Sequence, residues 1–477
     1  MRSSIPSPSG ELIRCTATEL SKRLHSGEIS PVDVIDAAAA RIQEVNPSVN
    51  ALPILCLEQA HDKARAMTDQ TSRAGDKGAL WGLPLAVKDY NDLAGVTTTY
   101  GSPLFAQNIA SHSDATVKRL QASGAIAVGK SNVPEWAGAH TFNPVFGHTL
   151  NPWNQDMSAG GSSGGSGAAL AAGMVALATG NDLGGSLRVP ASFNGVVGLR
   201  PSPGRVPRGA RLPAFDTLWV EGPMGRCVAD VALMLDGGAG FDPVDPLSFP
   251  HHGESFVDAL SRSELPKRVA FSPDLGVVPM EDEIASLCGE AAERFRDIGA
   301  AVSHLSPDFS GAIESFQTLR GVLIAQMMES ILAKHRDQIA PEIIWNIEKG
   351  LAVTNSELLA AERVRSGLYR EMEKFFGEYD LLLCPAVSVP PFPKSQRYVE
   401  TINGQPTQTY IDWIAITFAI TMTSCPALSL PIGFTQTGLP VGLQVVGPPR
   451  GEAALLRACH HMEAVFDLAA TLPIDPR

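Results

Sequence analysis

The chain has 477 residues, 44% of them hydrophobic, which is enough material for a large buried core. Charged residues make up 18%, and the 44 glycines and 36 prolines stay well below the fraction typical of collagenous or disordered chains. The formal net charge of −13 argues against nonspecific binding to nucleic acid or to an anionic membrane.

The cysteines and the N-terminal segment indicate where the protein works. Seven cysteines are scattered without CxxC spacing, so we expect neither a disulfide framework nor a zinc site, and a reducing, cytoplasmic compartment fits best. Residues 1–10 are rich in Ser and Pro and lack the apolar region of a secretory signal, which predicts a short disordered leader. No apolar stretch is long and uninterrupted enough to cross a bilayer.

Helical and strand patterns alternate in the first part of the chain. Ser30 and Pro31 form an N-cap and a first helical position, and the Val/Ile/Ala period that follows predicts a helix as far as Val45. The patterns further predict helices over 57–68 and 114–122 and short buried strands over 83–87 and 125–128. This alternation is typical of an α/β protein, and Lys88 and Asp89 stand directly after the first strand.

The rest of the chain continues the same alternation. We expect helices over 168–179, 282–295 and 355–376, and strands over 381–383 and 443–446, while the apolar segment 414–430 predicts buried core. No internal repeat and no long linker divides the sequence. We therefore expect residues 11–477 to form a single domain.

Glycine and serine are concentrated in two segments, 159–166 (AGGSSGGS) and 181–186 (NDLGGS), which we call the first and second Gly-Ser segments. Because glycine weakens regular structure, this density indicates a backbone at positive φ or close to a ligand. A Gly-Gly-Ser turn places a hydroxyl beside several backbone N–H groups, which an acyl-transfer site requires. For either segment taken alone, a tight turn that only lets a helix pack on a strand is the favoured explanation, because glycine-rich turns are common.

Two other motifs compete for these segments. Residues 160–164 match the G-x-S-x-G nucleophile elbow, but that motif needs a preceding strand, and residues 151–156 have a loop composition. Its histidine would have to be His460 or His461, which the pattern places on a helix. The phosphate-binding pattern GxxxxGK[ST] is absent.

Together these motifs resemble those of the amidase signature family. The resemblance rests on Lys88 after an apolar strand, on both Gly-Ser segments, and on the segments DLGGSLRVP (182–190) and GVVGLRP (195–201). It extends to GKSN at 129–132, GPMGR at 222–226 and GLPVGLQ at 438–444, and so covers about 18–466. The sequence departs from the family at Phe193 and Asn194, where an aromatic residue and a cysteine are common.

The resemblance implies a fold and a set of site residues. The fold is a large mixed β-sheet covered by helices on both faces, with a catalytic core at about 80–205. The triad would consist of Ser186 as nucleophile, Ser162 as a bridging serine preceded by a cis peptide bond, and Lys88 as base. The implied oxyanion hole consists of the backbone N–H groups of Leu183, Gly184, Gly185 and Ser186, and no metal or organic cofactor is implied.

Lys88 can act as a base only if it loses its proton. An ordinary lysine, with a pKa of about 10.4, is charged at neutral pH, but burial at the end of an apolar strand lowers that pKa. Asp89 would oppose this effect unless it points to the other face of the strand. Lys130 is a rival for the role, and we expect Asp182 and Arg188 to pair and hold the nucleophile turn.

These expectations predict an amidohydrolase that acts on a small-molecule amide through an acyl-enzyme. Trp136, Phe142, Met327, Trp345 and Trp413 would give an acyl pocket for aryl or bulky amides, or they are simply core. One alternative is the glutamine-amidase subunit of a tRNA-dependent amidotransferase, although residues 410–431 lack its Asn-Leu-Ala-Gly pattern. Another is a noncatalytic binding protein. A homodimer remains open.

Overall fold

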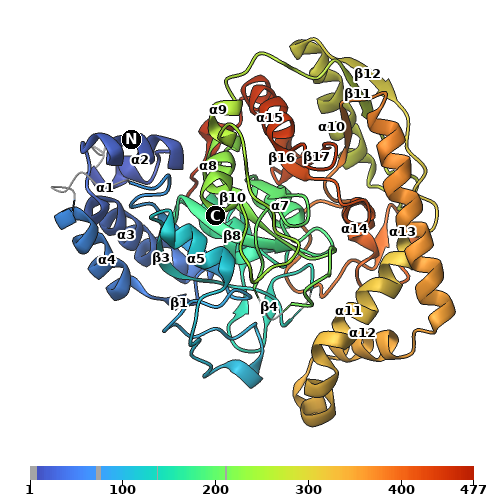
Figure 1. Cartoon of the computed structure of the whole chain (residues 1–477), viewed down its shortest axis with the longest axis horizontal. Coiled ribbons are helices and arrows are strands. Elements are labelled where there is room, and N and C mark those ends of the chain that lie inside the picture. Colours follow the sequence, from blue (N-terminus) through green and yellow to red (C-terminus); the bar gives the residue numbers. More distant parts are fainter. Residues whose placement is uncertain (1–7, 71–76, 137, 210–211) are drawn as a thin grey trace.

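A large mixed sheet runs through the centre of the molecule. The computed structural model describes residues 8–70, 77–136, 138–209 and 212–477. Within these residues, eleven strands form one sheet in the order β1-β3-β2-β8-β10-β9-β16-β17-β13-β11-β12 (Figure 1). Their bounds are β1 Ile54–Leu55, β2 Pro84–Lys88, β3 Ile126–Ser131, β8 Leu177–Asp182, β9 Val197–Arg200, β10 Val220–Gly225, β11 Arg268–Phe271, β12 Ala301–His304, β13 Leu381–Pro385, β16 Ala427–Phe434 and β17 Pro440–Val446.

Strand direction brings the two halves of the site together. Strands β3, β2 and β8 are parallel neighbours, as are β13, β11 and β12, whereas the strands between these groups pair antiparallel. The carboxyl ends of parallel strands meet at one edge of a sheet. Lys88 at the end of β2 therefore lies beside the end of β8, where the second Gly-Ser segment begins.

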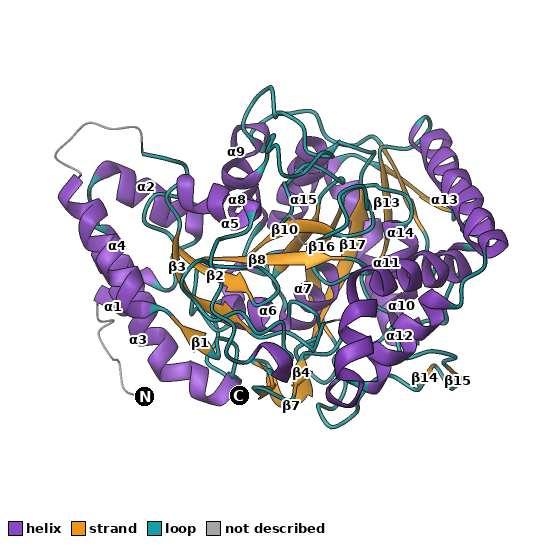
Figure 2. Ribbon diagram, turned by 60° about the horizontal axis from the view of Figure 1, so that its bottom comes forward, coloured by secondary structure: helices purple, strands orange, loops and turns teal. Residues whose placement is uncertain are grey.

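Helices cover both faces of the sheet (Figure 2). Ala86 of β2 packs with α3, α4 and α6 on one face, whereas Leu85 and Val87 pack with α2, α5 and α8 on the other. The helices are α1 Pro8–Leu12, α2 Ala17–Ser26, α3 Pro31–Val49, α4 Leu57–Gln70, α5 Ala115–Ala122, α6 Gly164–Ala171, α7 Arg188–Asn194, α8 Val228–Gly238, α9 Phe256–Ala259, α10 Asp282–Glu293, α11 Ala312–His335, α12 Pro341–Leu351, α13 Asn355–Phe376, α14 Ala415–Thr421 and α15 Glu452–Phe466.

Most predicted elements are confirmed to within a few residues. The N-cap of α3 is a capping box in which the Ser30 side chain accepts from the Asp33 amide while the Asp33 carboxylate accepts from the Ser30 amide. Helix α13 has the predicted bounds, and α10 gives way to a short 3₁₀ helix at Arg294. The apolar segment 414–430 is buried core, as expected, and forms α14 and the start of β16.

Three expectations need correction. The predicted helix 168–179 is wrong, because α6 ends at Ala171 and Gly173 adopts a φ of +74°, after which residues 177–182 form strand β8. The segment 151–156 is not simply loop, since β6 Leu150–Asn151 pairs with β7 Asn154–Ser158 in a separate hairpin. Of the predicted leader, residues 1–7 lie outside the described residues and 8–10 belong to α1.

Two further two-stranded sheets, β4 Phe142–Asn143 with β5 Gly147–His148 and β14 Thr401–Ile402 with β15 Gln405–Pro406, lie outside the large sheet. The long helices α11 and α12 contact each other through glycines: a Cβ on Gly350 would lie 1.9 Å from the backbone oxygen of Gly321. None of the helices in the described segments combines the length and the apolar character needed to cross a membrane.

Candidate active site

Lys88 lies at the centre of a buried polar cluster. Its Nζ lies 2.7 Å from Oγ of Ser162 and 2.8 Å from Oγ of Ser163, and it donates to Oδ1 of Asn181 at 2.6 Å. Side chains alternate along a strand, so Lys88 points to the same face as Ala86, toward the start of α6. Strand β2 thereby delivers an amine to the first Gly-Ser segment.

The surroundings of Lys88 favour its neutral form. Burial lowers the pKa of the Lys88 amine from its ordinary value of 10.5 to about 7, while the carboxylates of Glu221 and Asp182 act in the opposite direction. A base with a pKa near the working pH is partly unprotonated and can accept a proton. Lys88 therefore has the protonation behaviour that a general base requires.

Glu221 is a buried carboxyl group next to this cluster. It lies directly opposite Asn181 in the β8–β10 ladder, and it accepts from the Asn91 amide at 3.1 Å and the Trp219 indole at 3.2 Å. Burial raises the pKa of Glu221 to about 7. Glu221 and Lys88 therefore titrate as an interacting pair.

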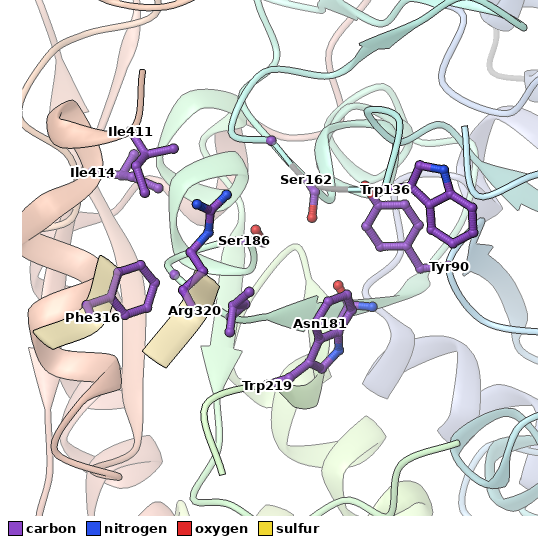
Figure 3. A pocket seen from close by; sticks show the side chains of 13 residues that line it. Tyr90, Trp136, Ser162, Asn181, Ser186, Trp219, Phe316, Arg320, Ile411 and Ile414 are labelled. Atoms are coloured by element: carbon purple, nitrogen blue, oxygen red, sulfur yellow. The ribbon is translucent and has the colours of Figure 1, made fainter. Parts of the chain in front are cut away.

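The two adjacent serines of the first Gly-Ser segment occupy different environments. The Gly161–Ser162 peptide bond is cis, and Ser162 lines the same cavity as Ser186 (Figure 3). Ser163 is fully buried and does not line that cavity. Both hydroxyls reach Lys88, but only that of Ser162 also faces the space into which Ser186 opens.

Ser186 lies in the turn between β8 and α7. Arg188 binds Asp182 through both carboxylate oxygens, at 2.8 and 3.0 Å, which confirms the predicted pair, and Arg200 approaches the same carboxylate at 3.2 Å. Although burial alone would raise the pKa of Asp182, the two guanidinium groups hold it well below its ordinary range. The ionised Asp182 thus anchors the turn that carries Ser186.

One of the four amides expected in the oxyanion hole is already engaged. The Gly185 amide donates to Oδ1 of Asp182 at 2.8 Å, whereas Leu183, Gly184 and Ser186 line the cavity. Gly185 has a φ of +122°, and a Cβ there would lie 2.3 Å from Oγ1 of Thr417. Gly185 therefore shapes the turn, and in this structure its amide serves the Asp182 carboxylate.

The departure from the family pattern at Asn194 affects packing near the first Gly-Ser segment. The Asn194 side chain donates to the backbone oxygens of Ala159 and Pro190 at 2.8 and 2.7 Å. Phe193 stacks on Trp413 at 6.0 Å between ring centroids. The hydrogen bond from Asn194 to Ala159 joins α7 to the segment that precedes Ser162.

Lys130, the rival base, is held in an ion pair. Its Nζ lies 2.7 Å from Oδ1 of Asp89 and 2.8 Å from Oγ1 of Thr98, and both charged groups are buried. Asp89 accordingly faces away from Lys88, as the alternation of the strand predicts. Lys130 does not line the cavity that contains Ser186.

The cavity lined by Ser162 and Ser186, which we call the catalytic cavity, has a volume of about 40 Å³ and adjoins two larger cavities. An apolar cavity of about 270 Å³ shares Tyr90, Trp136, Leu183 and Trp219 with it. A second cavity of about 450 Å³ adjoins it at Gly138. In Figure 3 the aromatic residues Tyr90 and Trp136 lie on one side of the two serines and Arg320 on the other.

The candidate pocket residues are distributed unevenly. Trp136 lines the catalytic cavity and the apolar cavity, and Met327 lines the apolar one. Phe142 and Trp413 line the 450 Å³ cavity. Trp345 lines none of the three and is 38% exposed.

Several residues of this region were not expected from the sequence, among them Tyr90, Asn181, Trp219, Glu221 and Arg320. Asn181 directly precedes Asp182 in the second Gly-Ser segment, and this adjacency is a signal that could have been used. Tyr90, two residues after Lys88, carries its ring 4.8 Å from the amine. Glu221 directly precedes the segment 222–226, which is part of the family resemblance, whereas Trp219 and Arg320 come from segments with no chemical motif.

A group of possible metal ligands lies elsewhere. Asp92, His112 and Asp114 place ligand atoms within 4.8 Å of one another, the one such group among the described residues. Asp92 already accepts from the Tyr100 hydroxyl at 2.7 Å, and its amide donates to Asp114 at 3.0 Å. None of the three lines the catalytic cavity.

Comparisons with known proteins show which family the chain resembles. A family model described as Amidase matches residues 33–456. An acylamidase from Rhodococcus erythropolis is 34% identical, covering 96% of this chain and 97% of that protein, and a subunit of the glutamyl-tRNA(Gln) amidotransferase from Moorella thermoacetica is 34% identical, covering 95% and 97%. The crystal structure of a bacterial aryl acylamidase superposes with a TM-score of 0.89 at 27% identity, covering 96% and 99%.

The fold and these relatives define a hydrolase that acts on carboxylic amide bonds. The chain belongs to the amidase signature family. The expected α/β class, with one large mixed sheet between helices, is confirmed.

Proposed function

We propose that the protein hydrolyses amides through an acyl-enzyme on Ser186, with Ser162 and Lys88 as the proton relay. The observation that carries this proposal is the position of the Lys88 amine, buried and 2.7 Å from Oγ of Ser162, which faces the cavity that Ser186 lines. The pKa of that amine, about 7, suits a base at neutral pH.

The steps follow from this arrangement. Ser186 gives its proton to Ser162, which gives its own to the neutral Lys88 amine, and Oγ of Ser186 bonds to the substrate carbonyl carbon. When the carbon–nitrogen bond breaks, the proton returns from Lys88 through Ser162 to the leaving amine. Water then gives a proton through Ser162 to Lys88 and attacks the ester carbonyl carbon. When the bond to Oγ of Ser186 breaks, that proton returns through Ser162 to Ser186 and the carboxylic acid leaves.

Charge on the carbonyl oxygen needs backbone donors. We assign the oxyanion hole to the amides of Leu183, Gly184 and Ser186, because these residues line the cavity while the Gly185 amide is bound to Asp182. The ion pair of Asp182 with Arg188 keeps those donors in place before the substrate arrives. The relay itself calls for no metal or organic cofactor.

We further propose aryl or otherwise bulky amides as substrates. The apolar cavity of about 270 Å³ opens beside the catalytic serines and is lined by Tyr90, Trp136 and Trp219. Its size and aromatic walls suit a ring or a branched chain. The names of the acylamidase and aryl acylamidase relatives point the same way.

A second candidate is the amidase subunit of a tRNA-dependent amidotransferase, since such subunits reach 34% identity over nearly the whole chain. Purified protein that hydrolyses anilides but not glutamine would exclude this alternative. Glutaminase activity that appears only with partner subunits would support it.

Covalent labelling tests the assignment of the serines. A fluorophosphonate should add its phosphonyl mass to the peptide that contains Ser186, and Ser186→Ala should abolish the label. Ser162→Ala should slow labelling and turnover strongly, because it breaks the relay while the nucleophile remains.

Ser163→Ala is the matched control for the relay. Ser163 contacts Lys88 at 2.8 Å yet does not line the cavity, so its loss should cost much less than that of Ser162. A label on Ser162 that survives Ser186→Ala would overturn the assignment, since a nucleophile elbow predicts that result.

A further inference from the structure

Arg320 of α11 is a buried cation in the wall of the catalytic cavity. Its side chain is 4% exposed and lines this cavity together with Ser162 and Ser186 (Figure 3). The neighbouring wall residues Phe316 and Ile414 are apolar. A guanidinium in such surroundings loses hydration, and that loss is normally offset by a carboxylate partner.

The partners of Arg320 are neutral. One Nη donates to Oδ1 of Asn346, and the other donates to the Tyr410 hydroxyl at 2.5 Å. Among the described residues no carboxylate forms a salt bridge with Arg320, whereas Arg188, Arg205 and Arg208, also buried, each pair with one. Two of the five guanidinium N–H groups are thus engaged, and the described residues supply no counterion within ion-pair distance of its charge.

Nearby carboxylates are committed elsewhere. Asp412 accepts from the amides of Gln408 and Thr409 at 2.7 and 2.8 Å, and Glu342 pairs with Arg397. The other charged group close by, Lys349, is itself a cation: burial lowers the pKa of Lys349, and the charge of Arg320 lowers it further. Neither these carboxylates nor Lys349 line the catalytic cavity, so Arg320 is the charged side chain that this wall presents to it.

The guanidinium is held in place from three segments. Asn346 of α12 donates to the Tyr410 hydroxyl at 2.6 Å and to the Glu342 backbone oxygen at 2.7 Å, which fixes its side-chain oxygen toward Arg320. The close glycine contact of α11 and α12 brings these groups together. A cation positioned this way before binding loses little conformational freedom when an anion arrives.

We infer that Arg320 binds a carboxylate of the substrate, so that the preferred amide carries an anionic group at the α11 side and its apolar part in the 270 Å³ cavity. This inference rests on the proposed function, because the same serines must cleave the bound amide. Arginine suits the role because its planar fork matches a carboxylate. The carboxylate belongs either to the acyl half or to the amine half of the substrate.

Two matched pairs of anilides test this inference and separate the two halves. Succinanilic acid and 4-oxopentananilide differ by a carboxylate against a methyl ketone in the acyl half. The same change in the amine half distinguishes 4-acetamidobenzoate from 4-acetamidoacetophenone. We expect kcat/KM of the unaltered enzyme to favour the carboxylate in one pair by about tenfold or more.

Variants identify the residue responsible. Arg320→Gln should bring the ratio of kcat/KM for the carboxylate to that for the ketone close to one. Arg320→Lys keeps the charge but not the planar guanidinium, and it should retain part of the preference. Lys349→Gln is the matched control, because it removes a nearby cation that does not line the catalytic cavity. It should leave the ratio unchanged.

The outcomes are separable. If the unaltered enzyme shows no preference for the carboxylate in either pair, the inference is overturned. This result does not depend on whether the variants fold. A ratio that survives Arg320→Gln overturns it as well. If the unaltered enzyme cleaves no anilide and takes no label on Ser186, the proposed function itself fails, which is a different result from cleavage without charge preference.

Discussion

At the scale of single residues, the proposed chemistry depends on one lysine that must lose its proton. Lys88→Ala should remove most turnover while the protein stays folded, and Lys88→Arg should not restore it because arginine stays charged. Because the neutral form is active, kcat/KM should rise with pH through a value of about 7 and then level off. Steady-state kinetics from pH 5 to 10 would check both expectations.

Lys130→Ala is the comparison for this variant, since Lys130 is equally buried but paired with Asp89. Its main effect should be lost stability, because it leaves a buried carboxylate unpaired. Near-normal turnover in Lys88→Ala, or a loss confined to Lys130→Ala, would move the base elsewhere.

The carboxylate of Glu221 should set where that pH profile rises. Its negative charge raises the pKa of Lys88, so Glu221→Gln should lower the Lys88 pKa and move the acid limb of kcat/KM to lower pH, by roughly half a unit or more. Glu452→Gln, which alters a buried carboxylate paired with Arg205, should leave the limb in place. If the acid limb of kcat/KM does not move in Glu221→Gln, the titrations of Lys88 and Glu221 are not coupled.

At the scale of elements, the turn between β8 and α7 depends on contact with α14. Gly185→Ala should lower kcat by more than about tenfold, because its φ of +122° disfavours a side chain and a Cβ would meet Thr417 at 2.3 Å. Gly276 has a φ of +66°, and a Cβ added there would meet no atom within 4 Å. Gly276→Ala therefore introduces backbone strain without a steric contact, and the variant should keep its activity. Equal kcat values for the two variants would contradict the role of that contact.

Helix caps away from the site should affect stability only. Ser30→Ala removes the side-chain half of the capping box of α3 and should cost about 1 kcal/mol in the free energy of unfolding. Urea titration measures this loss, and kcat should stay within experimental error. A clear fall in kcat would mean that α3 influences the site through the core on the face of the sheet that they share.

At the scale of the whole molecule, the mechanism predicts activity without a metal. No His, Cys, Asp or Glu is among the described residues that line the catalytic cavity, so incubation with EDTA should leave turnover intact. If EDTA abolished turnover and a divalent cation restored it, the proposed mechanism would be wrong. Abolition of that sensitivity by His112→Ala would then locate the metal at the Asp92, His112 and Asp114 group.

The sequence by itself determined the local structure and the chemical groups of the core. Strand periodicity placed Lys88 at the end of a buried strand, and the capping residues located the start of α3. The helix predicted over 168–179 failed because Ala, Val and Leu suit either a helix or a buried strand. Only the sheet, which pairs β8 with β2 and β10, decided in favour of a strand.

Only the tertiary structure decided which lysine is free to act. Lys88 ends β2, Lys130 is the penultimate residue of the adjacent parallel strand β3, and both are fully buried. They differ because Asp89 faces Lys130, whereas Asn181 and the serines face Lys88. The walls of the catalytic cavity could not be predicted from the sequence either, because Trp219 and Arg320 come from segments far apart in the chain. Local periodicity depends on neighbours within a few residues, whereas a binding site depends on which distant side chains the packing brings together.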